Sequence, residues 1–329
     1  MKMNRVANYW ENTQLGVKCL LCPNYCSIPE NKKGKCRKRI NLDDELFTEN
    51  YAQTISLSLD PLEKKPLYHF FPTEKVLSLG ANSCNLTCQF CQNYSSSQSE
   101  CDVLAILPVE LYDMCLQKDI KHVAFTYTEP FTWYEYVFDV AQLLHPNGIS
   151  VILVTNGYVN LKPLTDLLPY ISAMNIDLKA FSEDFYTNIC GGKLQPVLKT
   201  ISHASEKTHV EITLLLIETL NDDIEELRNL YSFIMNLSQD IPLHISKYFP
   251  RYKMSIRATN DAKLINTARI AKEYLNYVYI GNMHTSDFSN TYCPNCNALL
   301  IQRRDYNTHV VNLHGNQCSK CQKRISIIT

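Results

Sequence analysis

The chain has 329 residues, of which 45% are apolar and 20% charged, so its composition is that of a folded globular protein and excludes collagen-like and low-complexity chains. Its length predicts about two domains. The formal net charge is −1, so overall charge gives no support for binding to nucleic acid or to a membrane surface.

Cysteine usage is the unusual feature, with 14 in the chain. Residues 1–14 lack the apolar core of a secretory signal, and no run approaches the roughly 18 apolar residues of a membrane span. We therefore predict a cytoplasmic protein whose clustered cysteines bind metal and do not form disulfides. Three cysteines outside the clusters are interpreted as small buried apolar residues: Cys101, Cys115 and Cys190.

Residues 1–50 are predicted to form a small metal-stabilised module. Four thiolates suit either zinc or an iron–sulfur cluster. The long gap before the fourth cysteine favours zinc over the closer spacing of ferredoxin-type runs. A basic run at 32–39 is interpreted as a solvated face, although it is also compatible with an acidic peptide or RNA. The candidate ligands are Cys19, Cys22, Cys26 and Cys36.

Residues 51–285 alternate β-rich runs with helix-like stretches. Most of the runs are too continuously apolar to be half exposed, which predicts parallel strands covered on both faces. Alternation of strands and helices implies a parallel sheet or barrel, with chemistry at the carboxyl ends of the strands. The predicted helices are 108–118, 131–144, 222–237 and 261–276. The predicted strands are 75–82, 122–128, 149–156, 170–178, 209–217, 242–248 and 276–281.

Cys84, Cys88 and Cys91 follow the first predicted strand with the spacing Cys-x3-Cys-x2-Cys. Three thiolates on one tight loop can hold three corners of a cubane, whereas a structural zinc site or an ordinary [4Fe–4S] site uses four ligands. Three cysteines without a fourth nearby indicate an iron that is open to an exogenous ligand. The alternatives are zinc with a distant fourth ligand and a buried triad of thiols.

This motif, with Phe90 before its last cysteine, resembles that of the radical S-adenosylmethionine superfamily over roughly 70–285. The resemblance implies an α/β fold, a partial (βα)6 TIM-like barrel, here flanked by the N-terminal four-cysteine module and a C-terminal zinc ribbon. It also implies a [4Fe–4S] cluster that binds S-adenosylmethionine through its open iron. An external electron donor would then drive reductive cleavage to a 5′-deoxyadenosyl radical.

Two further strand ends are assigned to the cofactor through this resemblance. Thr128 and Glu129, in TYTEP, stand where the superfamily has a Gly-Gly-Glu-like stretch that contacts the methionine amino group, although the glycines are missing here. Glu129 also suits the N-terminus of a helix. Asn156, in TNG, resembles the contacts to the ribose and carboxylate side of the cofactor.

The fourth and sixth predicted strands add three residues. Asp177 and Lys179 resemble the Asp-x-Lys of the pyruvate formate-lyase activating enzyme branch, and a plain surface salt bridge is the alternative. His244 matches a strand-end histidine near the nucleoside in that branch, and a hydrogen-bonded core histidine is the alternative. All three are therefore candidate cofactor contacts.

A narrower resemblance extends over nearly the whole chain. Residues 59–98, TYTEP and the YIGN at 279–282 are similar to the radical enzyme of the AmmeMemoRadiSam systems, an activating-enzyme-like subgroup. This resemblance implies Memo-like and AMMECR-type proteins as partners. The resemblance identifies the cofactor chemistry far better than it identifies the reaction or the substrate.

Residues 286–329 are predicted to form a zinc ribbon, because two Cys-x2-Cys knuckles suit a tetrahedral structural site. His309 and His314, taken with the first knuckle, also satisfy the spacing of a two-Cys, two-His finger. The four-cysteine set is favoured because the finger would leave the second knuckle as two free thiols. The predicted ligands are Cys293, Cys296, Cys318 and Cys321.

These patterns together predict a radical enzyme that abstracts hydrogen from a protein or peptide substrate, since two peripheral modules can hold a macromolecule. The Asp-x-Lys and His244 also suit an activase that installs a glycyl radical on a partner enzyme. A remote alternative is a non-catalytic zinc-ribbon protein that binds nucleic acid or serves as a scaffold. The sequence does not identify the substrate.

Overall fold

The computed structural model describes residues 4–283 and 285–329. Its centre is an eight-stranded sheet in the order β16-β15-β14-β13-β12-β11-β9-β8, in which β8 (Leu57–Pro61) pairs antiparallel with β9 and the other pairs are parallel. The parallel strands are β9 (Lys75–Leu79), β11 (His122–Phe125), β12 (Ser150–Thr155), β13 (Ala173–Asp177), β14 (His209–Leu216), β15 (Leu243–Lys247) and β16 (Val278–Gly281).

Each parallel strand falls within one of the predicted runs, so the α/β class and the mostly parallel sheet are confirmed. A helix follows each of the first six parallel strands, and β16 adds a seventh strand to the six expected βα units. Within the described residues, β8 and β16 are the two ends of the sheet order, so the sheet is open. The connecting helices are α2 (Pro108–Gln117), α3 (Tyr134–Leu144), α4 (Leu161–Leu167), α6 (Leu194–Ser205), α7 (Ile224–Leu237) and α8 (Asp261–Ala271).

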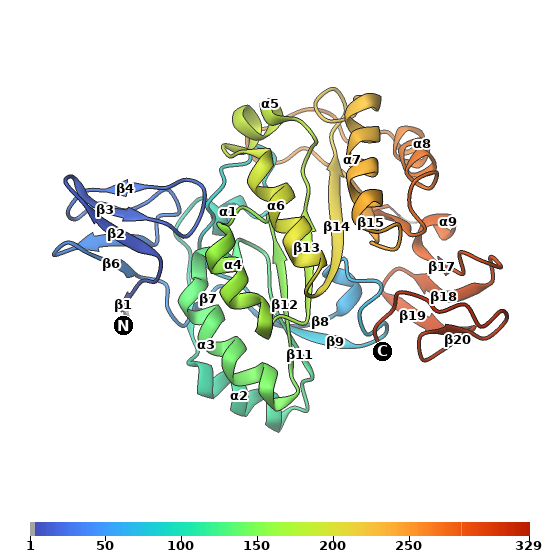
Figure 1. The fold of residues 1–329 in the computed structure, drawn as a ribbon, viewed down its shortest axis with the longest axis horizontal. Coiled ribbons are helices and arrows are strands. Elements are labelled where there is room, and N and C mark those ends of the chain that lie inside the picture. The colour runs from blue at the N-terminus through green and yellow to red at the C-terminus, as the bar shows by residue number, and fades with distance from the viewer. Residues whose placement is uncertain (1–3, 284) are drawn as a thin grey trace.

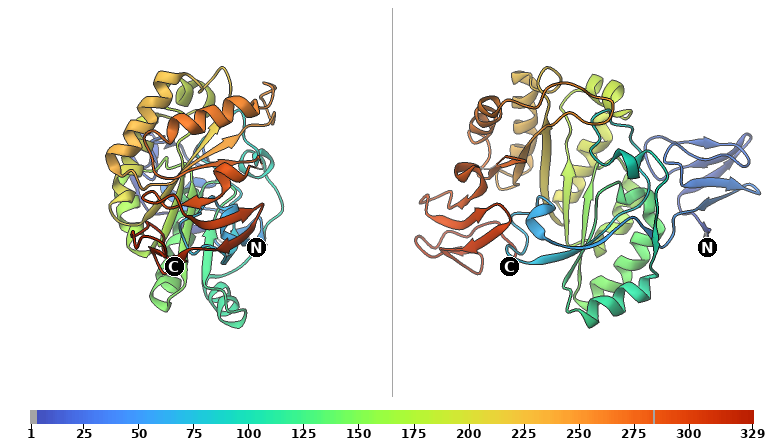
Figure 2. Two further views of the ribbon diagram at one scale, coloured as in Figure 1. Left: turned by 90° about the vertical axis from the view of Figure 1, so that its right-hand side faces the viewer. Right: turned by 180° about the vertical axis from the view of Figure 1, so that it is seen from behind.

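These helices cover the outer face of the curved sheet, as the two further views in Figure 2 show. Side-chain caps fix the start of two of them. Asp223 accepts hydrogen bonds from the backbone of Glu225 and Glu226 at the start of α7, and Asn260 caps α8 in the same way. None of the helices in residues 4–283 and 285–329 is both long and apolar enough to cross a membrane.

The N-terminal residues form small antiparallel sheets at one end of the molecule (Figure 1). They join the central unit through α3, because the buried side chains of Arg39 and Glu135 form an ion pair and the backbone NH of Asn8 donates to Glu135 at 2.8 Å. The strands are β1 (Arg5–Val6), β2 (Trp10–Thr13), β3 (Gly16–Cys19), β4 (Ser27–Ile28), β5 (Arg39–Leu42), β6 (Glu45–Thr48) and β7 (Gln53–Thr54), the last paired with β10 (Leu104–Ala105).

The C-terminal residues form further short strands at the opposite end of the molecule (Figure 1). Residues after Cys296 are strands and turns, where a two-Cys, two-His finger would need a recognition helix. The strands are β17 (Thr291–Tyr292), β18 (Leu299–Arg304), β19 (Asn307–Val310), β20 (Leu313–His314) and β21 (Gln317–Cys318). The remaining α-helices are short: α1 (Tyr94–Ser97), α5 (Glu183–Phe185) and α9 (Ser286–Ser289).

Candidate active site

The carboxyl ends of the parallel strands surround a cavity of about 360 Å³. The site lies here because every parallel strand ends at this edge and continues into a loop. Nine of the ten residues predicted to bind the cluster or the cofactor line this cavity. They are Cys84, Cys88, Phe90, Cys91, Thr128, Glu129, Asn156, Asp177 and Lys179.

The three cysteines come from the loop after β9. The backbone NH of Leu86 donates to Sγ of Cys84 at 3.4 Å, and Sγ of Cys91 lies 3.2 Å from the Ser97 hydroxyl. Burial raises the pKa of Cys84 and of Cys91, so these thiols hold their protons until a metal displaces them.

Cys88 has a further neighbour. Its hydrogen bond with the buried Cys190, together with burial, raises the pKa of the Cys88 thiol well above its ordinary value. Cys190 is not among the residues that line the cavity. Its interpretation as a small buried residue therefore fits its position, and three cysteines face the cavity.

Glu129 follows β11 and has one of its side-chain oxygens 2.7 Å from the Thr155 hydroxyl, which donates to it. Backbone NH groups of Asn156 and Phe131 also donate to its carboxylate, at 2.8 and 3.1 Å. The bond from Phe131 places Glu129 at the start of a short 3-10 helix, as its alternative interpretation expects. Burial nevertheless raises the pKa of Glu129 to about 7. A cation that enters the cavity would favour the ionised carboxylate.

Asn156 leaves β12 through a tight turn. Gly157 has φ +67, and a Cβ there would come within 2.9 Å of the Ile176 side chain, so glycine is required after Asn156. The turn brings Nδ2 of Asn156 to 3.6 Å from Sγ of Cys84. The TNG sequence thereby connects β12 to the cysteine loop.

Asp177 and Lys179 form an ion pair at 2.8 Å that faces the cavity, with the Lys179 side chain 13% exposed. The pair is therefore not the plain surface salt bridge that was its alternative. Burial lowers the pKa of Lys179, but Asp177, Cys88 and Cys190 outweigh it and hold that pKa well above its usual range. Lys179 thus supplies a permanent positive charge beside Cys88.

His244, the tenth predicted residue, lines an adjoining cavity of about 320 Å³. Its Nε2 lies 2.6 Å from the buried carboxylate of Glu211, and Tyr68 packs edge-on against its ring. His244 therefore has the hydrogen-bonded core environment of its alternative interpretation, and its role as a cofactor contact stays a prediction. The two cavities share Lys64, Pro66, Ser246 and Asn282 in their walls.

Sequence reasoning missed the segment before β9 that closes the cavity from the other side. Lys64, Lys65 and Pro66 line it, and Nζ of Lys65 lies 2.9 Å from Asp60 and 4.6 Å from the centre of the Tyr127 ring. The sequence feature that could have indicated this segment is the pair of adjacent lysines before a proline.

The terminal cysteines form two further sets. In the C-terminal set, all four sulfur atoms lie within 4.8 Å of one another, so these residues form a compact four-cysteine cluster. The N-terminal set lines one cavity of about 20 Å³. Both groupings match the ligand sets expected from spacing, and the metal that each binds stays a prediction.

Comparison with known proteins decides the family. The sequence pattern of the Radical SAM superfamily matches residues 79–231. An uncharacterised protein of Methanocaldococcus jannaschii is 37% identical over 321 residues, which are 95% of this chain and 96% of that protein. The chain belongs to the radical SAM superfamily.

Two other similarities concern parts of this radical SAM protein. The S-adenosyl-L-methionine-dependent tRNA 4-demethylwyosine synthase of the same archaeon is 34% identical over 116 residues, covering 34% of this chain and 36% of the synthase. The solved structure of Streptococcus suis SuiB bound to S-adenosylmethionine has a TM-score of 0.52 and 16% identity, covering 68% of this chain and 53% of SuiB. The latter likeness shows a shared fold.

Membership of the radical SAM superfamily implies a [4Fe–4S] cluster and S-adenosylmethionine, and the donor set of the cavity fits them. Cys84, Cys88 and Cys91 all line one cavity, and among the described residues they are not grouped as a compact single-ion site, unlike the four C-terminal cysteines. This arrangement suits a cubane, whose thiolates bind different irons, better than one ion. Cys84, Cys88 and Cys91 would hold the cluster.

Proposed function

We propose that this chain is a radical SAM enzyme that abstracts a hydrogen atom from a protein or peptide substrate. Cys84, Cys88 and Cys91 would hold the cluster, which would supply one electron for the reductive cleavage of S-adenosylmethionine to methionine and a 5′-deoxyadenosyl radical, and this radical would take the hydrogen atom to give 5′-deoxyadenosine. The observation that carries this proposal is the convergence of nine predicted residues on one cavity.

Different residues of the chain bind different parts of the cofactor. Lys179 supplies a fixed positive charge for the methionine carboxylate, and Glu129 supplies an acceptor for the methionine amino group. Phe90, Val154 and Leu215 contribute apolar wall to the cavity, which helps to exclude water from a reactive intermediate.

The adjoining cavity is an observation that favours a macromolecular substrate. It lies between the ends of β15 and β16 and residues Asp305 and Tyr306 of the C-terminal region. Because Ser246 and Asn282 belong to both cavities, a side chain held in the second cavity would lie next to the first. A peptide segment that enters would contact the central unit and the C-terminal strands at once. Memo-like and AMMECR-type proteins are the partners that we would test first.

The test is an anaerobic assay. The protein is reconstituted with iron and sulfide, reduced, and given S-adenosylmethionine, and 5′-deoxyadenosine is quantified beside a Cys88→Ala control. We expect product that depends on Cys88 and a mass change in a partner protein. Product without any mass change in the candidate proteins would contradict the proposed substrate class. A glycyl radical signal in the electron paramagnetic resonance (EPR) spectrum of a mixed partner would identify an activase instead.

A further inference from the structure

The cysteine sets at the two ends of the chain differ in how close their sulfur atoms are. In the C-terminal set, Sγ of Cys293 lies 3.5 Å from Sγ of Cys321, and Sγ of Cys296 lies 3.7 Å from Sγ of Cys318. Four thiolates bound at about 2.3 Å to a single zinc ion stand about 3.8 Å apart. The C-terminal set therefore has the dimensions of a site for one ion.

The N-terminal set is more open. The structure describes all four of its cysteines, and among the described residues only the C-terminal set forms a group of ligand atoms compact enough to hold one metal ion. Within the described chain, the cysteines of the predicted radical SAM cluster likewise do not form such a compact group. The N-terminal set therefore resembles the cluster site of this same molecule and differs from its compact site.

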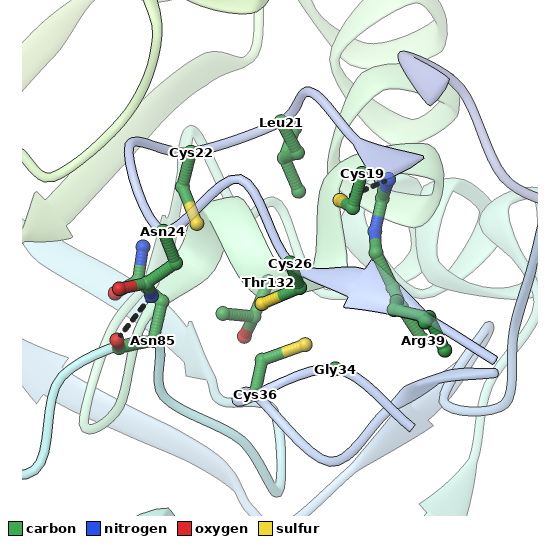
Figure 3. A pocket seen from close by; sticks show the side chains of 11 residues that line it. Cys19, Leu21, Cys22, Asn24, Cys26, Gly34, Cys36, Arg39, Asn85 and Thr132 are labelled. Atoms are coloured by element: carbon green, nitrogen blue, oxygen red, sulfur yellow. Dashed lines mark hydrogen bonds between the residues drawn. The ribbon is translucent and has the colours of Figure 1, made fainter. Parts of the chain in front are cut away.

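The space between the N-terminal cysteines agrees with their spacing. Figure 3 shows their side chains around a common hollow, with Leu21 and Thr132 among its walls. The hollow measures about 20 Å³, which is room for a body at least as large as a water molecule. Four thiolates closed on one zinc ion leave no such room, whereas a cubane spreads its thiolates because each one binds a different iron.

The surroundings also suit an anionic cluster. Arg39, 1% exposed, donates a hydrogen bond from Nη1 to Sγ of Cys19 at 3.6 Å, and the backbone NH of Lys35 donates to Sγ of Cys26 at 3.4 Å. Hydrogen bonds and a buried positive charge stabilise cluster sulfur and tune its potential. Leu21 and Ile28 close the wall with apolar side chains, which limits the access of water.

The site also lies against the loop that holds Cys84. The Ser83 hydroxyl donates to the backbone oxygen of Cys36 at 2.9 Å, and Asn24 donates to the backbone oxygen of Asn85 at 2.8 Å. Asn85 itself forms part of the wall of the N-terminal hollow. The residues on both sides of Cys84 are thus in contact with the N-terminal set.

We infer that the N-terminal set binds a second [4Fe–4S] cluster, with all four corners held by protein, in place of the zinc ion that its spacing in the sequence favours. The inference goes beyond the proposed reaction, because a fully ligated cluster has no open iron for S-adenosylmethionine. Its ligands are Cys19, Cys22, Cys26 and Cys36.

The test counts metals in a chain that lacks the other cluster. A variant with Cys84→Ala, Cys88→Ala and Cys91→Ala is reconstituted anaerobically with iron and sulfide, and iron, sulfide and zinc are measured per chain. We expect about four irons to remain, with a [4Fe–4S] signature in the Mössbauer spectrum. Adding Cys22→Ala and Cys36→Ala to the same variant should remove this iron and leave the C-terminal zinc.

Two results would overturn the inference. One is a triple variant that carries no iron and about two zinc ions per chain. The other is a reconstituted wild-type chain that holds about four irons, where two clusters require about eight, and that keeps all of them when Cys22→Ala and Cys36→Ala are introduced. The wild-type count does not depend on how the variants fold, and neither count depends on cleavage of S-adenosylmethionine. Failure of this inference is therefore distinguishable from failure of the proposed function.

Discussion

Nδ2 of Asn156 lies 3.6 Å from Sγ of Cys84 and donates a hydrogen bond to it. The same nitrogen donates to Oδ1 of Asn85 at 2.9 Å, and Oδ1 of Asn156 accepts from the backbone NH of Tyr158 at 2.8 Å. One side chain at the end of β12 therefore orients both a predicted cluster ligand and the residue that follows it.

Replacing Asn156 by Ala should weaken turnover without loss of the cluster. Hydrogen bonds to charged groups contribute about 1.5–3 kcal/mol, so 5′-deoxyadenosine formation should fall by roughly tenfold or more. The reduction potential of the cluster should become more negative, because a donor to its sulfur is lost. Redox titration followed by EPR measures this shift. The exposed Asn147→Ala is the matched control, and an Asn156→Ala chain with normal potential and normal turnover would contradict the prediction.

Lys179 offers a test of cofactor binding. Its ammonium group faces the cavity beside Asp177, and its pKa is held well above the usual range, so it stays charged at all working pH values. Replacing Lys179 by Met removes the charge but keeps most of the side-chain volume. The Kd for S-adenosylmethionine should rise by about tenfold, the equivalent of about 1.4 kcal/mol. Calorimetry on the reconstituted protein measures it, with the exposed Lys207→Met as control. An unchanged Kd would exclude Lys179 as a cofactor contact.

Most of the fold and most of the site could be predicted from the sequence, because the signals are local. Each parallel strand is a short apolar run, and motifs such as TNG follow their strands directly. Parallel strands share one carboxyl edge, so residues far apart in sequence, such as Glu129 and Lys179, were expected to meet there.

Long-range pairing could not be predicted in the same way. Lys64 and Lys65 lie before the first parallel strand, and long-range packing, such as that of Lys65 against the Tyr127 ring, brings them to the cavity. His244 shows a second limit. It was expected at the end of its strand, but it is the second residue of β15, and the buried carboxylate of Glu211 holds its ring toward the neighbouring cavity. No local sequence pattern around His244 predicts its hydrogen bond with Glu211.

The C-terminal cluster should contribute to stability because the metal binds only when its four ligands are assembled. Replacing Cys318, which is fully buried, by Ser should lower the melting temperature by several degrees and remove about one zinc ion per chain. A chelator should produce the same loss in the wild type. Differential scanning calorimetry and metal analysis measure both effects. Cys101→Ser, outside every cluster, is the control. A Cys318→Ser chain with an unchanged melting temperature would show that the cluster has no structural role.

Glu211 is fully buried on β14 and accepts four hydrogen bonds. The backbone NH groups of Tyr68 and His69 approach its oxygens at 3.0 and 2.7 Å, and the rings of His209 and His244 at 3.0 and 2.6 Å. Burial alone would raise the pKa of this carboxyl. The bonds from His209 and His244 outweigh burial and hold it well below its ordinary value. Glu211 therefore ties the segment before β9 to the inner face of the sheet.

Replacing Glu211 by Gln should lower the free energy of unfolding by about 3 kcal/mol at pH 7, because buried donors lose a charged acceptor. The pKa of Glu211 is depressed in the folded state, so its stabilisation is complete above the unfolded pKa of about 4.3 and declines as the pH falls below that value. The difference between wild type and variant should therefore shrink as the pH falls below about 4. Urea denaturation across this range measures it. The exposed Glu206→Gln should change stability by no more than about 0.5 kcal/mol at any pH. A difference for Glu211→Gln that grows as the pH falls below about 4 would mean that the carboxyl is not held ionised in the folded protein.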